Sequence, residues 1–470
     1  MKSKLWAVLF WVMALTTSGN AAESKLNFIV ILADDLGWTD LACYGSDFYE
    51  TPNIDKLARD GMKFTQAYSA CTVCSPTRAA LLTGKYPARL RVTDWIPGQP
   101  PENPKLIVPN FTKYLSPDEI SLGRALKNAG YATASIGKWH LGNEEHYPEK
   151  QGFDINIAGS HRPEPGSYFS PYKIPTLPDG PPGEYVTDRL ALETDRFLDA
   201  HHEKPFLLYL PHFAVHTPIQ GKPEVAAKYR DKKKPGQNQT NEMYAAMIES
   251  LDDAVGSLRR KLDELKLADR TVIIFTSDNG GRITQGTTSN HPLRAGKGGC
   301  YEGGTRVPFI VYWPKVTKPG SVSETPVISM DVFPTVLEIA ELKKSIPEKV
   351  DGVSLAPLLR QKGKLKRDTL FWHYPHYQHY QLGGTTPYGA IRSEDFKLIE
   401  YFDDMRVELY NLKDDIGEQR NLAAEQPKQV EKLRKQLHQW RKEVDAQMPT
   451  RNPDYDPSRP EYVPKKKKAA

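Results

Sequence analysis

The sequence predicts an α/β fold in which helices cover both faces of a large sheet, with a smaller C-terminal α+β subdomain. Three observations carry this prediction. The 470 residues are 39% hydrophobic and 10% aromatic, which is enough for a large packed interior and excludes a disordered chain. Short apolar runs alternate with helical patterns along most of the chain. The composition then changes near residues 359–367, a polar, basic stretch that suits a link between two units.

The predicted strands are continuously apolar, as in a sheet that is buried on both faces. They cover residues 28–32, 132–136, 206–210, 272–275 and 309–313. Such runs are typical of parallel sheets, whose crossover helices cover both faces. We therefore expect these strands to form the centre of the large domain.

The segments between these strands carry helix signals. Amphipathic stretches cover residues 188–200 and 242–266, and a shorter helical run over 122–129 ends at Gly130, a usual helix stop. Asn53 is placed to cap a helix over residues 54–60. Strands and helices thus alternate, as in a layered α/β domain.

The region after the basic link has a different pattern. Aromatic and alternating runs at residues 371–380, 389–402 and 406–412 predict antiparallel strands, and residues 426–448 predict one charged amphipathic helix. We expect a main domain over residues 23–362 and a C-terminal subdomain over residues 363–450. Residues 451–470 are rich in proline and charge, so we expect a basic, flexible tail.

The first 22 residues have the parts of a secretory signal peptide. Lys2 and Lys4 precede an apolar run over residues 5–15, and small residues follow it. An uncut membrane anchor is the alternative, but the run is short for a span of about 20 residues. We expect the leader to be removed and the protein to be exported, to the periplasm or outside the cell, with no stable membrane anchor.

The formal net charge of +5 comes from the two ends of the chain. Two lysines lie in the leader and four form the run 465–468, so the body between them is close to neutral. A nucleic-acid partner is therefore disfavoured, because such proteins carry a basic surface. Four cysteines are too few for a disulfide scaffold.

Polar side chains directly follow four of the predicted strands. The pairs are Asp34 and Asp35, Lys138 and His140, His212 and His216, and Asp278 and Asn279. Each pair alone has an ordinary structural explanation, since Asp-Asp can cap a helix and Asp-Asn-Gly is a common turn. Their joint placement favours one site, because ligands of open α/β sheets bind outside the carboxyl ends of the strands.

Asp34, Asp35, Asp278 and Asn279 offer only oxygen ligands. Such a set suits a hard divalent cation, whereas zinc would want histidine or cysteine among its ligands. Three crowded carboxylates also need a cation to offset their mutual repulsion. We expect one Ca²⁺, with Mg²⁺ as the alternative because ligand type alone does not fix the ionic radius.

Cys71 and Cys74 form a CxxC pattern. No thioredoxin-like context surrounds it, and no second pair of ligands supports a zinc site. The more informative pattern is CSPTR, from Cys74 to Arg78, followed by a short helical run that ends at Gly84.

This pattern, with LLTGKYPAR downstream, resembles the signature of the formylglycine-dependent sulfatases of the alkaline phosphatase superfamily. Further segments resemble the same family in the same order, namely LADDLGW, PNIDKLA, GKWHLG, VHTP, SDNGG and GKGGCYEGGTRVP. Together they span residues 29–308, and the ordered set is far more specific than one motif. The resemblance implies a sulfatase catalytic domain with a large mixed sheet over residues 23–362, and the C-terminal unit resembles the family's small subdomain.

The resemblance also implies a role for each matching residue. Cys74 would be converted to formylglycine (3-oxoalanine) by a formylglycine-generating, or sulfatase-maturating, enzyme, and its hydrate would be the nucleophile. Residue 74 would share the cation with the four oxygen ligands. Arg78 would stabilise the hydrate, and His140 would be the base that collapses it. The implied sulfate clamps are Lys138 and Lys297, and His216 would protonate the leaving alcohol.

The implied substrates are sulfate monoesters of a small molecule or a glycan, and degradation of sulfated polysaccharides is suggested by analogy. Candidate specificity residues are His291, Arg294, His373 and His376. Two alternatives remain: a phosphodiester or phosphonate ester hydrolase of the same superfamily, and an inactive, secreted, calcium-dependent binding protein. The latter is expected to lack a nucleophile, base or clamp, and none is missing. Conversion of Cys74 would leave three cysteines, so at least one thiol stays free: Cys43, Cys71 or Cys300.

Overall fold

A mixed eight-stranded sheet forms the centre of the computed structural model, which describes residues 25–99, 101–232, 238–378 and 385–460. The strand order is β10-β2-β9-β8-β1-β7-β5-β6. The strands are β1 (Asn27–Ala33), β2 (Met62–Phe64), β5 (Ala132–Ile136), β6 (Ile155–Ile157), β7 (Phe206–Pro211), β8 (Thr271–Ser277), β9 (Phe309–Tyr312) and β10 (Ser321–Ser323).

The five strands β8, β1, β7, β5 and β6 run parallel to one another. Strand β9 runs antiparallel to both β8 and β2. Its apolar run had suggested a parallel strand, and that expectation was wrong: burial on both faces makes a run continuously apolar whatever its direction. The large mixed sheet expected from the family resemblance is confirmed.

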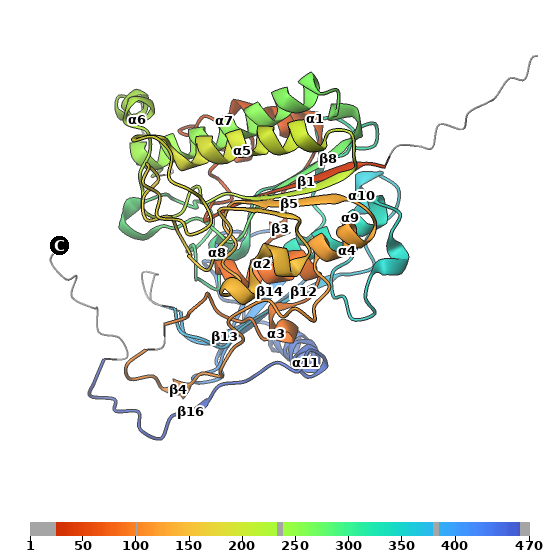
Figure 1. Ribbon diagram of the computed structural model, residues 1–470. Coiled ribbons are helices and arrows are strands. Elements are labelled where there is room, and N and C mark those ends of the chain that lie inside the picture. The colour runs from red at the N-terminus through yellow and green to blue at the C-terminus, as the bar shows by residue number, and fades with distance from the viewer. Residues whose placement is uncertain (1–24, 100, 233–237, 379–384, 461–470) are drawn as a thin grey trace, which may run out of the picture.

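Helices cover both faces of this sheet (Figure 1). One layer contains α1 (Pro52–Asp60), α5 (Val186–His201), α6 (Pro223–Arg230) and α7 (Glu242–Glu264), and the other contains α2 (Cys74–Thr83), α4 (Leu122–Asn128), α9 (Val332–Ile339) and α10 (Ala356–Leu359). Strand β1 shows why its sequence is apolar throughout. Ile29 and Ile31 pack into the core under the first layer, whereas Val30 and Leu32 pack into the core over the second.

Side-chain caps fix the starts of two of these helices. The Asn241 side chain accepts a hydrogen bond from the Tyr244 amide at the start of α7, and Ser121 does the same for α4. The cap expected at Asn53 is absent. Helix α1 begins at Pro52, and the Asn53 side chain instead donates to Asp252 on α7 at 2.8 Å.

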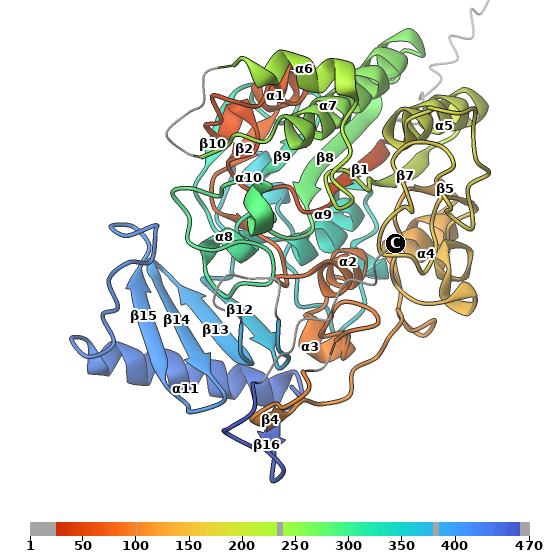
Figure 2. The ribbon, with the colours of Figure 1, turned by 90° about the vertical axis from the view of Figure 1, so that its left-hand side faces the viewer.

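The C-terminal subdomain is a four-stranded antiparallel sheet with one helix against it (Figure 2). It contains β12 (Thr369–Tyr374), β13 (Tyr388–Ser393), β14 (Phe396–Tyr401), β15 (Val407–Asn411) and α11 (Pro427–Glu443). One apolar cluster joins its sheet and helix to α2 and to the segment that precedes α2. A buried ion cluster adds to this junction: Lys397 Nζ lies 3.1 Å from Glu302 and 3.0 Å from Glu418.

The remaining short α-helices and strands are α3 (Pro87–Leu90), α8 (Glu302–Thr305), the pair β3 (Ala67–Tyr68) and β11 (Val327–Ile328), and the pair β4 (Leu106–Ile107) and β16 (Thr450–Arg451). The predicted tail therefore starts with a strand pairing. The Asn103 side chain continues this contact by donating to the carbonyls of Asp456 and Arg459.

The predicted signal peptide, residues 1–22, and the lysine run 465–468 lie outside the described residues. Within the part of the chain that is described, no helix has both the length and the apolar character needed to cross a membrane.

Candidate active site

Four neighbouring strands, β8, β1, β7 and β5, end at the same edge of the sheet and bring the polar pairs together. Backbone hydrogen bonds tie the strand ends to one another. The amide of Asp34 donates to Ala214 at 2.9 Å, that of Lys138 donates to Pro211 at 2.7 Å, and that of Asp278 donates to Ala33 at 3.1 Å. The site is thus built on the rigid part of the fold, as the sequence pattern predicts.

The backbone is unusual at two of these positions. Asp35 and His140 have φ values of 61° and 57°, in the left-handed region that non-glycine residues seldom adopt. Gly137, just before Lys138, has a φ of 128°, and a Cβ atom there would collide with the Pro211 carbonyl. Such conformations concentrate at functional sites, where the surrounding structure holds them in place.

Cys74 is the first residue of α2, and the whole of this helix is buried. Its side chain therefore sits at the positive end of a helix dipole, which favours negative charge there. Arg78 lies one turn further along the same helix. Its guanidinium contacts Asp278 at 2.7 Å and Asp34 at 3.6 Å, and it donates to the Lys138 carbonyl.

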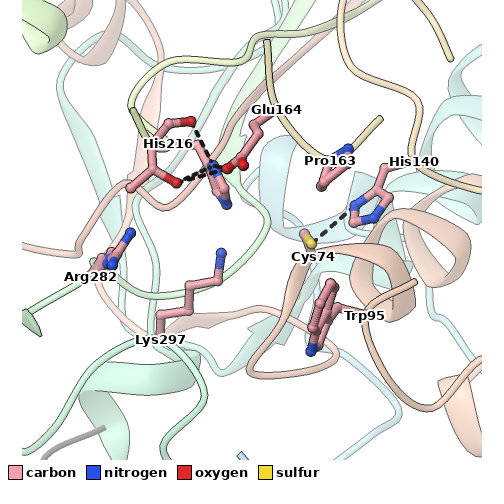
Figure 3. Close-up of a pocket in the computed structure, with 9 residues that line it drawn as sticks. Cys74, Trp95, His140, Pro163, Glu164, His216, Arg282 and Lys297 are labelled. Atoms are coloured by element: carbon pink, nitrogen blue, oxygen red, sulfur yellow. Dashed lines mark hydrogen bonds and ion pairs between the residues drawn. The ribbon is translucent and has the colours of Figure 1, made fainter. Parts of the chain in front are cut away.

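His140 faces Cys74, with its Nδ1 atom 3.3 Å from the Cys74 Sγ atom (Figure 3). Its other ring nitrogen, Nε2, contacts the Ile96 carbonyl at 2.5 Å. A carbonyl can only accept, so Nε2 carries the hydrogen and Nδ1 presents a lone pair to residue 74. Burial and the neighbouring Lys138 ammonium hold the pKa of His140 well below its usual range. His140 is therefore a neutral base next to residue 74.

Three carboxylates and three cationic side chains form the buried floor of the site. Lys138 Nζ lies 2.6 Å from Asp34, and Lys297 Nζ lies 2.8 Å from Asp35. Burial opposes ionisation of Asp35, but Lys297, His216 and Lys138 outweigh it and lower its pKa. Burial, reinforced by the Asp34 charge, raises the pKa of Asp278 to about 6.

The oxygen donors of this floor fit a metal ion. The Asp34 Oδ1 and Asn279 Oδ1 atoms are buried and accept no hydrogen bond within the described structure. Buried oxygens without a partner are rare, and a cation would satisfy both. Oxygen atoms of Asp34 and Asp35 also lie within 4.8 Å of a ring nitrogen of His216. The structure thus places a histidine beside the predicted oxygen set.

One ring nitrogen of His216 is surrounded by hydrogen-bond acceptors, and the other faces the Asp35 carboxylate. Its Nδ1 atom lies 3.0 Å from the Thr217 carbonyl and 3.3 Å from the Glu164 carboxylate, so Nδ1 carries a hydrogen. Its Nε2 atom lies 3.7 Å from Asp35 Oδ2. Burial alone would raise the pKa of Glu164, but the contact with His216 lowers it to about 2. Glu164 therefore stays ionised beside the Nδ1 atom of His216.

A cavity of about 280 Å³ opens above this floor (Figure 3). The side chains that line it are Cys74, Trp95, His140, Pro163, Glu164, His216, Thr217, Arg282 and Lys297. Four of these were predicted from the sequence: Cys74, His140, His216 and Lys297. The predicted Asp34, Asp35, Arg78, Lys138, Asp278 and Asn279 are buried in the floor beneath them.

The four candidate specificity residues do not line this cavity. His373 and His376 are buried. The Nε2 atom of His373 contacts the Gln447 carbonyl, and the Nε2 atom of His376 contacts Thr93 Oγ1. Arg294 donates to the Glu418 carbonyl and stacks over Tyr301 at 3.7 Å. His291 is exposed. In this structure these side chains support the junction with the C-terminal subdomain or face solvent.

The cavity also contains residues that the sequence gave no reason to select. Trp95 and Glu164 lie in long connections without a recognisable motif. Arg282 directly follows the SDNGG segment, and this position in the sequence was the one indication that it lies near the site. His212, left without a role by the sequence, is buried, and neither of its ring nitrogens has a partner among the described residues.

Comparisons with known proteins agree with this geometry. A family model described as Sulfatase matches residues 26–342, and one described as N-sulphoglucosamine sulphohydrolase, C-terminal, matches residues 296–447. A Sulfatase of Formosa agariphila is 34% identical, with 91% of each chain covered. The N-acetylgalactosamine-6-sulfatase of Sus scrofa is 33% identical over 78% of this chain and 72% of the relative.

Solved structures share the fold. The crystal structure of Ps i-CgsB in complex with k-i-k-neocarrahexaose superposes with a TM-score of 0.74 and 30% identity, covering 89% of this chain and 93% of that one. The phosphonate monoester hydrolase of Agrobacterium radiobacter superposes with a TM-score of 0.66 at 21% identity, covering 89% and 96%. At that identity the second likeness concerns the fold alone.

Proposed function

The chain belongs to the sulfatase family and is an enzyme that hydrolyses sulfate esters, and we propose that it acts on sulfate monoesters of carbohydrates, with residue 74 as a formylglycine nucleophile beside one divalent cation. The contact between Cys74 Sγ and the lone pair of His140 Nδ1 carries this proposal. It puts a base at the one side chain of the cavity that the family signature selects as the nucleophile.

Formylglycine, when formed from Cys74, supplies a hydrated aldehyde with two hydroxyl groups, one to attack sulfur and one to expel the sulfate. His140 is placed to take a proton from the side chain of residue 74, since its Nδ1 faces that side chain and its Nε2 is held by Ile96. Arg78, anchored by Asp278, holds a positive charge one helical turn from residue 74. Conversion of the thiol requires an oxidising maturation enzyme as a partner.

Asp34, Asp35, Asp278 and Asn279 would hold the cation, together with residue 74. Their unpartnered oxygens support this assignment, and the all-oxygen set suits Ca²⁺, with Mg²⁺ as the alternative. A bound cation would polarise a sulfate oxygen and favour an ionised side chain at residue 74.

Lys297 and Lys138 are the proposed clamps for the scissile sulfate. Lys297 lines the cavity, and Lys138 lies beneath it with no solvent exposure. In a site closed to water, such fixed positive charges stabilise negative charge that develops on sulfate oxygens. A burial penalty lowers the pKa of Lys297, but Asp35 outweighs it and keeps the ammonium charged.

His216 is the proposed acid for the leaving alcohol. The Glu164 carboxylate lies 3.3 Å from Nδ1, and Nε2 is the ring nitrogen left for the cavity. This leaves distinct tasks for the two histidines: His140 removes a proton at residue 74, and His216 supplies one to the departing oxygen.

The lining of the cavity supports a carbohydrate substrate. Trp95 offers an aromatic face, and Glu164, Thr217 and Arg282 add hydrogen-bonding groups to the lining. The named relatives include N-acetylgalactosamine-6-sulfatases, and Ps i-CgsB was crystallised with k-i-k-neocarrahexaose. We further propose that the chain is exported after removal of residues 1–22, to the periplasm or outside the cell.

The decisive experiment is a panel of esters assayed with enzyme that has been expressed with a maturation enzyme. We expect turnover of sulfated sugars and of an aryl sulfate, with phosphodiesters and phosphonate esters at least about 100-fold slower in kcat/KM. Faster turnover of phosphonate esters than of any sulfate would overturn the proposal in favour of the related hydrolase class.

A further inference from the structure

Arg282 is a cationic side chain of the cavity that forms no ion pair with the residues that the structure describes. It is half-buried, and among the described residues its one side-chain hydrogen bond runs from Nε to Thr284 Oγ1 at 2.7 Å. The other charged groups of the cavity wall are already paired, Lys297 with Asp35 and Glu164 with His216. The two terminal nitrogens of the Arg282 guanidinium are therefore left for a ligand.

The backbone holds Arg282 next to the sulfate clamp. The carbonyl of Gly281 accepts hydrogen bonds from the Lys297 amide at 3.1 Å and from the Asn290 side chain at 3.0 Å. The Arg282 carbonyl accepts from Thr288 at 3.3 Å. Figure 3 shows Arg282 beside Lys297 and His216, on the side of the cavity away from Cys74. The guanidinium is thus fixed at a second position of the same pocket.

We propose that Arg282 binds a second anionic group of the substrate, a sulfate or a carboxylate, so that the preferred substrates are sugar sulfates with two negative groups. This inference rests on the proposed function of the cavity. The planar fork of a guanidinium matches both kinds of anion with two parallel hydrogen bonds. Lys297 and Lys138 are not free for this task, because they are the proposed clamps for the scissile sulfate and each is held by a carboxylate, Asp35 and Asp34 respectively.

The charge of Glu164 determines on which side of the cavity a second anionic group of the substrate can lie. A carboxylate at the cavity wall repels an anion, and among the described residues that line the cavity its partner is His216. An anionic substituent is therefore excluded from the Glu164 side and favoured on the Arg282 side. A cavity of about 280 Å³ is at the small end of ligand pockets, which suits one sugar unit with its substituents.

The test compares kcat/KM within matched pairs of substrates for wild type, Arg282→Gln and Arg282→Lys. The pairs are N-acetylgalactosamine 6-sulfate with its 4,6-disulfate, and glucosamine 6-sulfate with its 2-N,6-O-disulfate, with an aryl sulfate as the reference. Lys364→Gln, on the exposed basic link, is the control for loss of one positive charge. The readout is the ratio of the two kcat/KM values in one preparation, which does not depend on the fraction of folded enzyme.

We expect wild type to prefer at least one dianionic substrate over its monosulfated partner. Arg282→Gln should reduce that preference by about 10- to 100-fold, Arg282→Lys should restore part of it, and Lys364→Gln should leave it as in wild type. An active wild type without such a preference, or a preference that survives Arg282→Gln, would overturn the inference alone. A wild type that hydrolyses no sulfate ester would overturn the proposed function and the inference with it.

Discussion

His140 and Cys74 lie side by side, with Nδ1 of the imidazole 3.3 Å from Sγ of the thiol. The ring is held in this orientation, because Nε2 donates to the Ile96 carbonyl and the side chain is buried. The segment that carries Ile96 is itself anchored two residues earlier. The Asp94 carboxylate accepts hydrogen bonds from the Trp95 amide and from Tyr374 of the C-terminal subdomain. The subdomain thus takes part in orienting His140.

The first prediction concerns the chemical state of residue 74. Mass spectrometry of the tryptic peptide from active enzyme should show an aldehyde, or its hydrate, where the gene encodes the Cys74 thiol. Cys74→Ala should abolish turnover, because no other side chain of the cavity faces the lone pair of His140. An unmodified thiol in fully active protein would contradict the mechanism.

Cys71 is the matched control for this prediction. It lies three residues before Cys74 and does not line the cavity, and burial raises the pKa of its thiol to about 12. Such a thiol stays protonated and unreactive at neutral pH. Cys71→Ala should therefore retain most of the activity and carry the same modification at residue 74.

The second prediction concerns the cation. Purified enzyme should contain one equivalent of calcium by elemental analysis, and Asp278→Ala should lose both the metal and the activity. Asp47→Asn, on the surface, is the control and should keep both. Stoichiometric zinc without calcium would count against the oxygen set.

His216→Ala separates two interpretations of the same cluster. If His216 is the acid and not a ligand, the variant should retain its calcium although turnover of sugar sulfates falls. Loss of the metal in this variant would make His216 a ligand, as its proximity to Asp34 and Asp35 allows.

The positions of the site residues in the sheet could be predicted because each lies at the end of an apolar strand. Asp34, Lys138, His216 and Asp278 follow β1, β5, β7 and β8, which are neighbours in the sheet. Parallel strands place their carboxyl ends at one edge of the sheet. The position of these residues directly after apolar runs was therefore enough to assign them to one edge.

The cavity wall could not be predicted in the same way. Trp95 and Glu164 reach the site from connections whose course is set by tertiary contacts, such as the bonds of Asp94 and Thr217 to distant segments. The burial of His373 and His376 away from the cavity could not be predicted for a related reason. A histidine-rich, aromatic strand has the same composition whether its polar atoms face a ligand or, as here, the interior of a domain junction.

The third prediction uses the titration of Asp94. Burial raises the pKa of this carboxyl to about 7, although the hydrogen bonds from Tyr374 and Trp95 oppose the shift. The folded protein therefore binds this proton more tightly than the unfolded chain. The stability that Asp94 contributes is present below about pH 4 and is lost as the pH rises through about 7.

Asp94→Asn should remove this dependence while its amide oxygen still accepts from both donors. We expect the melting temperature of the variant to rise relative to wild type between pH 5 and pH 8. Asp94→Ala should be less stable than wild type at pH 5, because both donors lose their acceptor. If the difference in melting temperature between wild type and Asp94→Asn stays constant from pH 5 to pH 8, Asp94 does not titrate in this range.

The last prediction concerns the leaving group and compares the roles proposed for His216 and His140. An aryl oxide departs readily without help, whereas a sugar alkoxide needs a proton in the transition state. His216→Ala should therefore reduce kcat/KM by roughly 10²–10⁴-fold for a sulfated sugar and far less for an aryl sulfate. Glu164→Gln keeps a polar partner for Nδ1 but removes the carboxylate that lies 3.3 Å from it, so the variant should show the same selectivity with a smaller loss.

His140→Ala is the counterpart that completes the test. The step that His140 serves, release of sulfate from residue 74, no longer contains the alcohol, so the variant should slow both substrates to a similar extent. Rapid-quench measurements with an aryl sulfate should then show one equivalent of phenol released before a slow steady state. If His216→Ala slows both substrates equally and His140→Ala shows the dependence on the leaving group instead, the acid and the base have been assigned the wrong way round.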